Sequence, residues 1–177
     1  SAFNVTFACK IDSTKVDSEH LIACWNAVLA RHDIFRSRSH LDYRGKGPRR
    51  TYARYCPQVM RVHGFNLWRE ANRPFHPDRQ HPIRVIVSKS MMLVAMSHLI
   101  ADLTTLQVIL GEVVRLYRGD GLGPVKRNYH ETTQWSSQAT ANEREWWVQY
   151  LGNTTVQRDD LYSIPNLTHR SSYGGQT

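Results

Sequence analysis

An imidazole and a carboxylate four residues apart, His98 and Asp102, are the side chains of this chain best placed to do chemistry. Nine His and fifteen acidic residues give roughly one such spacing by chance, and this pair is the only one present. The context adds more: His98 follows the apolar run 91–96, and a helical pattern comes next and ends near Arg118. A junction of buried strand and helix can hold an imidazole rigidly at the edge of a cavity, where it accepts a proton as a general base. Asp102 falls at the helix start, where free backbone N–H groups favour a carboxylate.

A purely structural interpretation of the pair stays open, in which His98 ends a strand and Asp102 only caps a helix. The other histidines are weaker candidates. His32, at a predicted helix end, is expected to contact the helix dipole. His76 and His81 lie in a proline-rich loop without metal-ligand spacing, so no metal site is predicted. No nucleophilic residue lies in a G-x-S-x-G context, which favours general-base chemistry over a covalent intermediate.

The apolar pattern predicts both strands and helices around this junction. Strands are expected at 3–11, 34–38, 50–56, 59–62, 83–88 and 91–96. Helices are expected from Asp17 or Ser18 to about 31, over 65–72, from 102 to 118 and from Thr133 to Leu151. Aromatic residues recur at helical spacing in the last helix and are predicted to be core: Trp135, Trp146, Trp147 and Tyr150. This mixture indicates an α/β or α+β fold with a mixed sheet.

The net charge of +8 indicates an anionic partner, such as a nucleic acid, a phosphate-bearing ligand or an acidic protein. The arginines between 31 and 61 lack the basic–aromatic repeats of RNA-binding segments, so no nucleic acid is predicted. Cys9, Cys24 and Cys56 are widely spaced, which argues against disulfides and zinc and favours a reducing, cytoplasmic location. No apolar run reaches membrane length, so no membrane partner is predicted.

Four segments, in order, resemble motifs of the condensation domains of nonribosomal peptide synthetases. They are 31–38 for the RHxxLR segment, 73–75 with 81–84 for PF…PxR, 97–103 for the HHxxxDG core, and Tyr129, Trp135, Trp147 and Leu151 for the segment that closes the first lobe. The resemblance implies an α/β, chloramphenicol-acetyltransferase-like lobe over 1–152, a mixed β-sheet packed with helices as a two-layer sandwich. Residues 153–177 are expected to be a polar tail or the start of a linker to a missing second lobe.

The resemblance implies that His98 is the catalytic residue in amide or ester formation from carrier-bound thioesters. Asp102 then has a structural role, and Arg36 of the RHxxLR segment is its implied partner. Ser97 and Leu103 depart from the family core, which has His and Gly at these places. The resulting SHxxxD core resembles the terminal condensation-like domains of fungal synthetases, which often cyclise a finished peptide. Leu103 adds a side chain near the channel and so argues against ordinary access of an acceptor.

The resemblance also implies the partners. The substrate is carried on the phosphopantetheine of a peptidyl or acyl carrier protein, a second lobe of the same parent chain completes the site, and no cofactor binds directly. The lobe alone is expected to be inactive. Two alternatives stay open: a CoA-dependent acyltransferase that uses the same HxxxD core, and a non-catalytic lobe that only binds a carrier protein.

Overall fold

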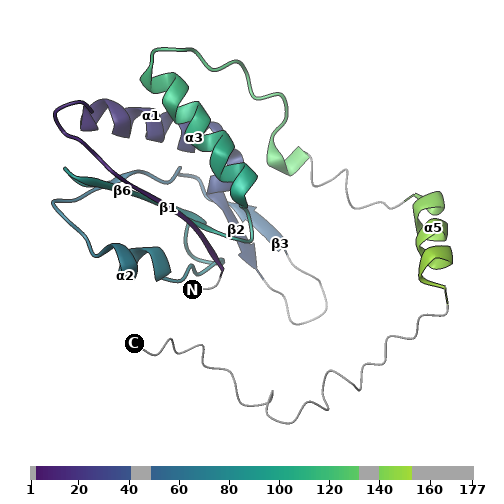
Figure 1. The fold of residues 1–177 in the computed structure, drawn as a ribbon. Helices are drawn as coiled ribbons and strands as arrows, with labels where there is room; N and C mark the ends of the chain where they lie inside the picture. Colours follow the sequence, from purple (N-terminus) through teal and green to yellow (C-terminus); the bar gives the residue numbers. More distant parts are fainter. Residues whose placement is uncertain (1–2, 41–48, 132–139, 153–177) are drawn as a thin grey trace, which may run out of the picture. The chain divides into compact units, whose positions relative to one another are not determined.

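The computed structural model describes residues 3–40, 49–131 and 140–152 of the 177-residue chain (Figure 1). The chain divides into two compact units, Ser1–Trp135 and Ser136–Thr177. The elements of the first unit are β1 (Asn4–Lys10), α1 (Ser18–Arg31), the 3₁₀ helix η1 (Asp33–Arg36), β2 (Ser37–His40), β3 (Arg49–Tyr52), β4 (Met60–Arg61), α2 (Leu67–Asn72), β5 (Ile83–Val87), β6 (Met91–Ser97) and α3 (Leu103–Tyr117). The second unit contains α5 (Ala141–Leu151).

The main sheet has four strands in the order β1-β6-β5-β4, and β2 pairs with β3 in a separate two-stranded sheet. β1 and β5 run antiparallel to β6, whereas β4 runs parallel to β5, so the predicted mixed sheet is confirmed. The central position of β6 explains its unbroken apolar run, because a strand covered on both faces has no polar side. Its last residue, Ser97, lies opposite Asn4 at the start of β1. The 97–103 segment, which carries His98, therefore begins at the end of β6, opposite the first residue of β1.

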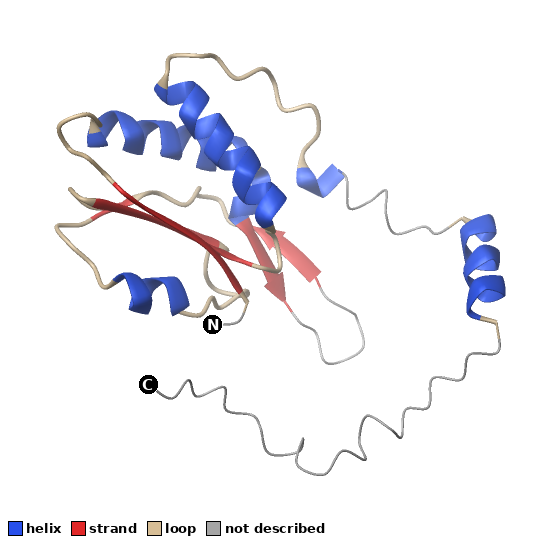
Figure 2. Ribbon diagram, in the orientation of Figure 1, coloured by secondary structure: helices blue, strands red, loops and turns tan. Residues whose placement is uncertain are grey.

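Helices cover both faces of the main sheet (Figures 1 and 2). α1 and α3 pack against each other over one face, and the short α2 lies on the other. The predicted start of α1 is confirmed, since the Asp17 carboxylate accepts from the N–H groups of Glu19 and His20. Trp25 of α1 is fully buried and donates its indole N–H to Met92 Sδ on β6 at 3.1 Å. The core thus joins α1 directly to the strand that carries the motif.

The predicted strand at 34–38 is wrong over its first half. η1 occupies Asp33–Arg36, and the strand β2 starts only at Ser37. Three consecutive residues of η1, from Asp33 to Phe35, are buried, which a strand with one apolar face cannot achieve because its side chains alternate between two faces. A helical turn points successive side chains around its axis and satisfies this burial.

Within the second unit taken by itself, the described aromatic residues of α5 are not core as predicted. Trp146, Trp147 and Tyr150 are 54%, 53% and 70% exposed, and α5 buries none of its residues. The Trp146 and Tyr150 rings instead stack on each other with centroids 5.0 Å apart, as expected for neighbours one helical turn apart. Trp135, the predicted helical part 133–139 and the tail 153–177 lie outside the described residues. No helix within the described residues has the length and apolar character needed to cross a membrane.

Candidate active site at the β6–α3 junction

The backbone around His98 is fixed from two sides. The His98 N–H donates to the Phe3 carbonyl just before β1, and the Ser97 N–H donates to the Pro82 carbonyl just before β5, both at 2.8 Å. The Ile100 N–H closes the turn by donating to the Ser97 carbonyl at 3.1 Å. His98 itself is exposed, and it does not line the small cavity beside Ser97, so its predicted place at the edge of a cavity stays a prediction. The arrangement presents an accessible imidazole on a backbone that two neighbouring segments hold in place.

Asp102 is the N-cap residue of α3, as its position in the sequence predicts. Its carboxylate accepts from the Thr105 N–H at 2.8 Å and from the Thr105 hydroxyl at 2.9 Å. The Asp102 N–H in turn points to Thr105 Oγ1 at 3.4 Å, which completes a capping box. The two hydrogen bonds from Thr105, with a smaller electrostatic contribution from His98, hold the pKa of the Asp102 carboxyl below its usual value. The carboxylate thus fixes the start of α3 four residues after the imidazole.

Asp102→Ala is expected to lower the melting temperature, because the first turn of α3 loses its side-chain cap. Asp102→Asn is expected to keep most of the stability, since an amide oxygen caps a helix nearly as well as a carboxylate. Thermal unfolding of both variants beside the wild type, followed by circular dichroism, measures the difference. Equal losses in the two variants would contradict capping as the role of Asp102 and would indicate a role that needs its charge.

The implied partnership of Asp102 with Arg36 is wrong in this structure. No ion pair of the described residues joins the two side chains. Arg36 ends η1, and its Nε is buried with no acceptor among the described residues. The physical reason is local: the unpaired N–H groups of the first turn of α3 lie next to the Asp102 carboxylate and bind it there.

Ser97 and Leu103, the two departures from the family core, have opposite surroundings. Ser97 is 6% exposed and lines a cavity of about 10 Å³ together with Ser37 and Ile100. That space fits about one water molecule and is too small for a substrate; His98 does not line it. Leu103 is 66% exposed, and it extends an apolar surface next to the turn. The apolar side chain of Leu103 is therefore accessible close in sequence to His98.

Residues at the end of α1 form two groups of side-chain contacts that residue spacing does not predict. Arg31 Nε and His32 Nε2 both contact the carboxylate of Glu112 on α3, at 3.1 and 2.6 Å. Asp33 Oδ2 lies 2.7 Å from His130 Nδ1. His32 is the C-cap residue of α1, at the helix end where it was predicted, and it also has a side-chain partner in Glu112. The consecutive Arg, His and Asp at a helix end were the one sequence signal for these contacts. Their partners lie 80 or more residues away in the sequence, so residue spacing could not identify them.

The contribution of Asp33 to the stability of the fold is expected to be present at neutral pH and lost in acid. Burial alone would raise the pKa of Asp33, but hydrogen bonds from the His130 ring and from the Tyr129 and His130 N–H groups outweigh burial and lower it. Asp33 therefore stabilises the fold above its unfolded pKa of about 3.9, and this contribution is lost as the pH falls through the lower folded pKa. We expect Asp33→Asn to be less stable than the wild type at neutral pH and the difference to shrink below about pH 4.

Urea unfolding of Asp33→Asn and the wild type across this pH range tests the expectation. Asp120→Asn, which changes an exposed carboxylate on the loop after α3, is the matched control and should show no such trend. A stability difference for Asp33→Asn that stays constant with pH would contradict the assignment.

Fungal nonribosomal peptide synthetases are similar to this chain over most or all of its length, although no family model matches it. The synthetase aclP of Aspergillus oryzae is 37% identical over 99% of this chain and 10% of that protein. The synthetase ataP of Aspergillus terreus is 34% identical over 85% of the chain and 10% of that protein, and gliP of Aspergillus fumigatus is 30% identical over 99% and 8%. The chain therefore spans about a tenth or less of the length of these relatives.

Solved condensation domains share the fold. The condensation domain of the monacolin K polyketide synthase MokA matches with a TM-score of 0.68 at 17% identity, over 83% of this chain and 37% of that one. A condensation domain for chain release from the enacyloxin polyketide synthase matches with a TM-score of 0.66 at 18% identity, over 84% and 34%. The condensation enzyme VibH gives 0.63 at 14% identity, over 84% and 40%. The chain is thus homologous to a segment of fungal nonribosomal peptide synthetases and shares its fold with part of the solved condensation domains.

Proposed function

We propose that this chain supplies the catalytic histidine of a condensation domain that forms an amide or ester bond from carrier-bound thioesters. The observation that carries the proposal is the exposed His98 on a doubly anchored turn between β6 and α3, in a chain homologous to peptide synthetases. The phosphopantetheine arm that brings the thioester is part of the substrate. The exposed Leu99 and Leu103 beside the turn suit contact with its apolar portions.

The proposed reaction requires the protein to supply a base, whereas the attacking nucleophile belongs to the substrate. A thioester is already activated, whereas an attacking α-amino group, with a pKa of about 8, is mostly protonated at neutral pH. The amine first loses its extra proton to water, and an imidazole nitrogen of His98 then accepts one N–H proton as the neutral amine nitrogen bonds to the thioester carbonyl carbon. The carbon–sulfur bond then breaks, and the thiol of the arm leaves with that proton. A hydroxyl nucleophile follows the same course and gives an ester.

The departures at Ser97 and Leu103 support a role at the end of peptide assembly. Leu103 is largely exposed and fills space that glycine leaves free in the family core. A bulkier residue there narrows access for a second carrier-bound substrate and suits an intramolecular nucleophile, which needs no separate acceptor. Terminal cyclisation is therefore the favoured form of the proposed reaction.

A transfer assay read by mass spectrometry tests the proposal against the CoA-dependent alternative. A two-lobe condensation domain that carries this chain is given the same acyl or peptidyl group on a carrier protein and, separately, on CoA. We expect product only, or at least predominantly, from the carrier-bound donor. Equal product from both donors would favour the CoA-dependent acyltransferase, and carrier binding without product from either would favour the non-catalytic lobe.

A further inference from the structure

A second candidate site lies outside the motif, in a pocket of about 270 Å³ at the start of β5. Three segments line it: the stretch that leads into β4 with the first residue of that strand, the loop after α2, and the first residues of β5. Its basic and amide lining residues are Arg73, Arg79, His81, Arg84, Gln58 and Gln80. The volume lies just below the range of about 300–1,000 Å³ typical of sites for drug-sized ligands, so the pocket suits a small group.

Positive charge in this pocket exceeds negative charge. Arg73 Nε lies 2.9 Å from the carboxylate of Glu70, and Arg79 Nε lies 3.1 Å from that of Asp78. The side chains of Arg73 and Arg79 are 42% and 83% exposed, so water weakens both pairs and leaves the guanidinium groups able to bind another anion. Three guanidinium groups therefore line the pocket, and carboxylates outside its lining pair with two of them. The third, on Arg84, forms no ion pair among the described residues.

The hydrogen bonds and the ring contact of Arg84 are made with uncharged groups. Its Nη2 donates to the carbonyls of Glu70 and Arg73 at 3.2 and 2.6 Å, at the end of α2, and its guanidinium carbon lies 4.0 Å from the centroid of the Phe75 ring. Burial lowers the pKa of Arg84 to about 10, and the positive charge of Arg73 adds to this while Glu70 opposes it. A bound anion would relieve that repulsion.

His81 adds polarity to the pocket but little charge. Burial lowers the pKa of His81, its bond to the Phe35 carbonyl opposes this, and the charge of Arg38 adds to the lowering. At neutral pH the positive charge of the site therefore comes from arginines. Guanidinium groups bind phosphate oxygens through paired N–H donors, and phosphate carries enough charge and oxygens to engage more than one of them.

We propose that this pocket binds a phosphate group, held by Arg73 and Arg79 at its rim with Arg84 behind them. None of its lining residues belongs to the 97–103 motif, and the inference rests on the proposed function only for a phosphate that belongs to a phosphopantetheine arm. Two sources supply such a group: the phosphodiester of a phosphopantetheine arm, or a free phosphate or phosphate monoester. The shared chemistry is a tetrahedral oxyanion facing several guanidinium groups.

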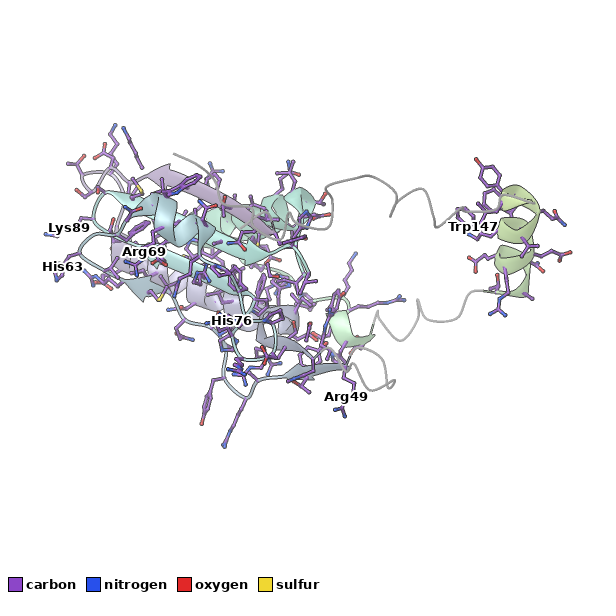
Figure 3. The ribbon with its side chains drawn as sticks, turned by 90° about the horizontal axis from the view of Figure 1, so that it is seen from below. Arg49, His63, Arg69, His76, Lys89 and Trp147 are labelled. Atoms are coloured by element: carbon purple, nitrogen blue, oxygen red, sulfur yellow. The ribbon has the colours of Figure 1, made fainter. Side chains whose placement is uncertain are left out.

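Isothermal titration of the 177-residue chain with inorganic phosphate, at constant ionic strength and neutral pH, tests the proposal. We expect saturable binding to one site, which Arg73→Gln or Arg79→Gln each weakens by about tenfold or more, as the loss of a charged hydrogen-bond donor does. Lys89→Gln is the matched control: it removes the same charge from the far end of β5, where Lys89 and His63 lie together (Figure 3), and should leave binding within about twofold. Arg84→Gln is avoided because Arg84 also holds the end of α2.

Wild-type melting temperatures for Arg73→Gln and Arg79→Gln would show that both variants are folded. Titration with pantetheine 4′-phosphate distinguishes the sources: tighter binding than inorganic phosphate indicates a carrier arm, and equal binding indicates a free phosphate. Absence of saturable binding, or equal weakening by Lys89→Gln and by the pocket variants, would overturn the proposal. Neither result bears on His98, so the proposed function is tested separately.

Discussion

His98→Ala is expected to slow carrier-dependent bond formation by about 10²–10⁴-fold while leaving the fold intact. The side chain is exposed and takes part in no hydrogen bond or ion pair of the described residues, so its loss should cost little stability. Residual activity is expected, because the thioester is already activated and because positioning of the reactants, which favours reaction by itself, survives the substitution. The measurement is single-turnover product formation by a two-lobe domain that carries this chain, supplied with a carrier-bound donor.

The control for this experiment is His63→Ala, which removes another exposed histidine at the hairpin end of the sheet. This variant should form product at the wild-type rate, and both variants should have the melting temperature of the wild type. A His98→Ala domain that forms product at the wild-type rate would contradict the general-base role and would favour a lobe that only binds its carrier protein. A domain that loses activity because it melts early would point to the structural interpretation of His98.

Trp25→Ala is expected to destabilise the chain by about 3–5 kcal/mol, the usual cost of removing a buried tryptophan. The indole is fully buried between α1 and β6, and its N–H donates to Met92 Sδ. A small domain has a total stability of about 5–15 kcal/mol, so this single change removes a large share of it. Urea unfolding followed by circular dichroism measures the loss, and Trp25→Phe, which keeps most of the volume, provides a milder variant if Trp25→Ala does not fold.

Trp68→Ala is the matched control, because Trp68 on α2 is 79% exposed. It should change the free energy of unfolding by no more than about 0.5 kcal/mol. Similar losses for the two tryptophans would contradict the core described above. A large loss only at Trp25 would confirm that the α1–β6 contact supports the strand on which the candidate site is built.

Prediction from sequence succeeded where the signal is local. The strands β5 and β6, the start of α1 at Asp17 and the capping role of Asp102 follow from residues close together in the sequence, and the structure confirms them. Prediction failed where a feature depends on contacts between segments that are far apart in the sequence. The strand predicted at 34–38 became a 3₁₀ turn because three residues in a row are buried there, and burial depends on distant elements. The helical spacing of the aromatic residues in α5 predicted that they are core, but such a pattern does not identify the surface against which a helix packs.

The sequence by itself determined the strand–turn–helix unit that carries His98, because a continuous apolar run, a turn and a capping residue encode it within about a dozen residues. Only the tertiary structure decided the side-chain partners. It showed the Asp102 carboxylate bound by its own helix rather than by Arg36, and Glu112 shared by Arg31 and His32. Ion pairs join groups that the fold brings together from far apart along the chain, and they require a distance of a few ångströms that no residue spacing specifies. The sequence therefore locates the chemistry, and the packing of α1, α3 and the sheet selects the contacts that hold it in place.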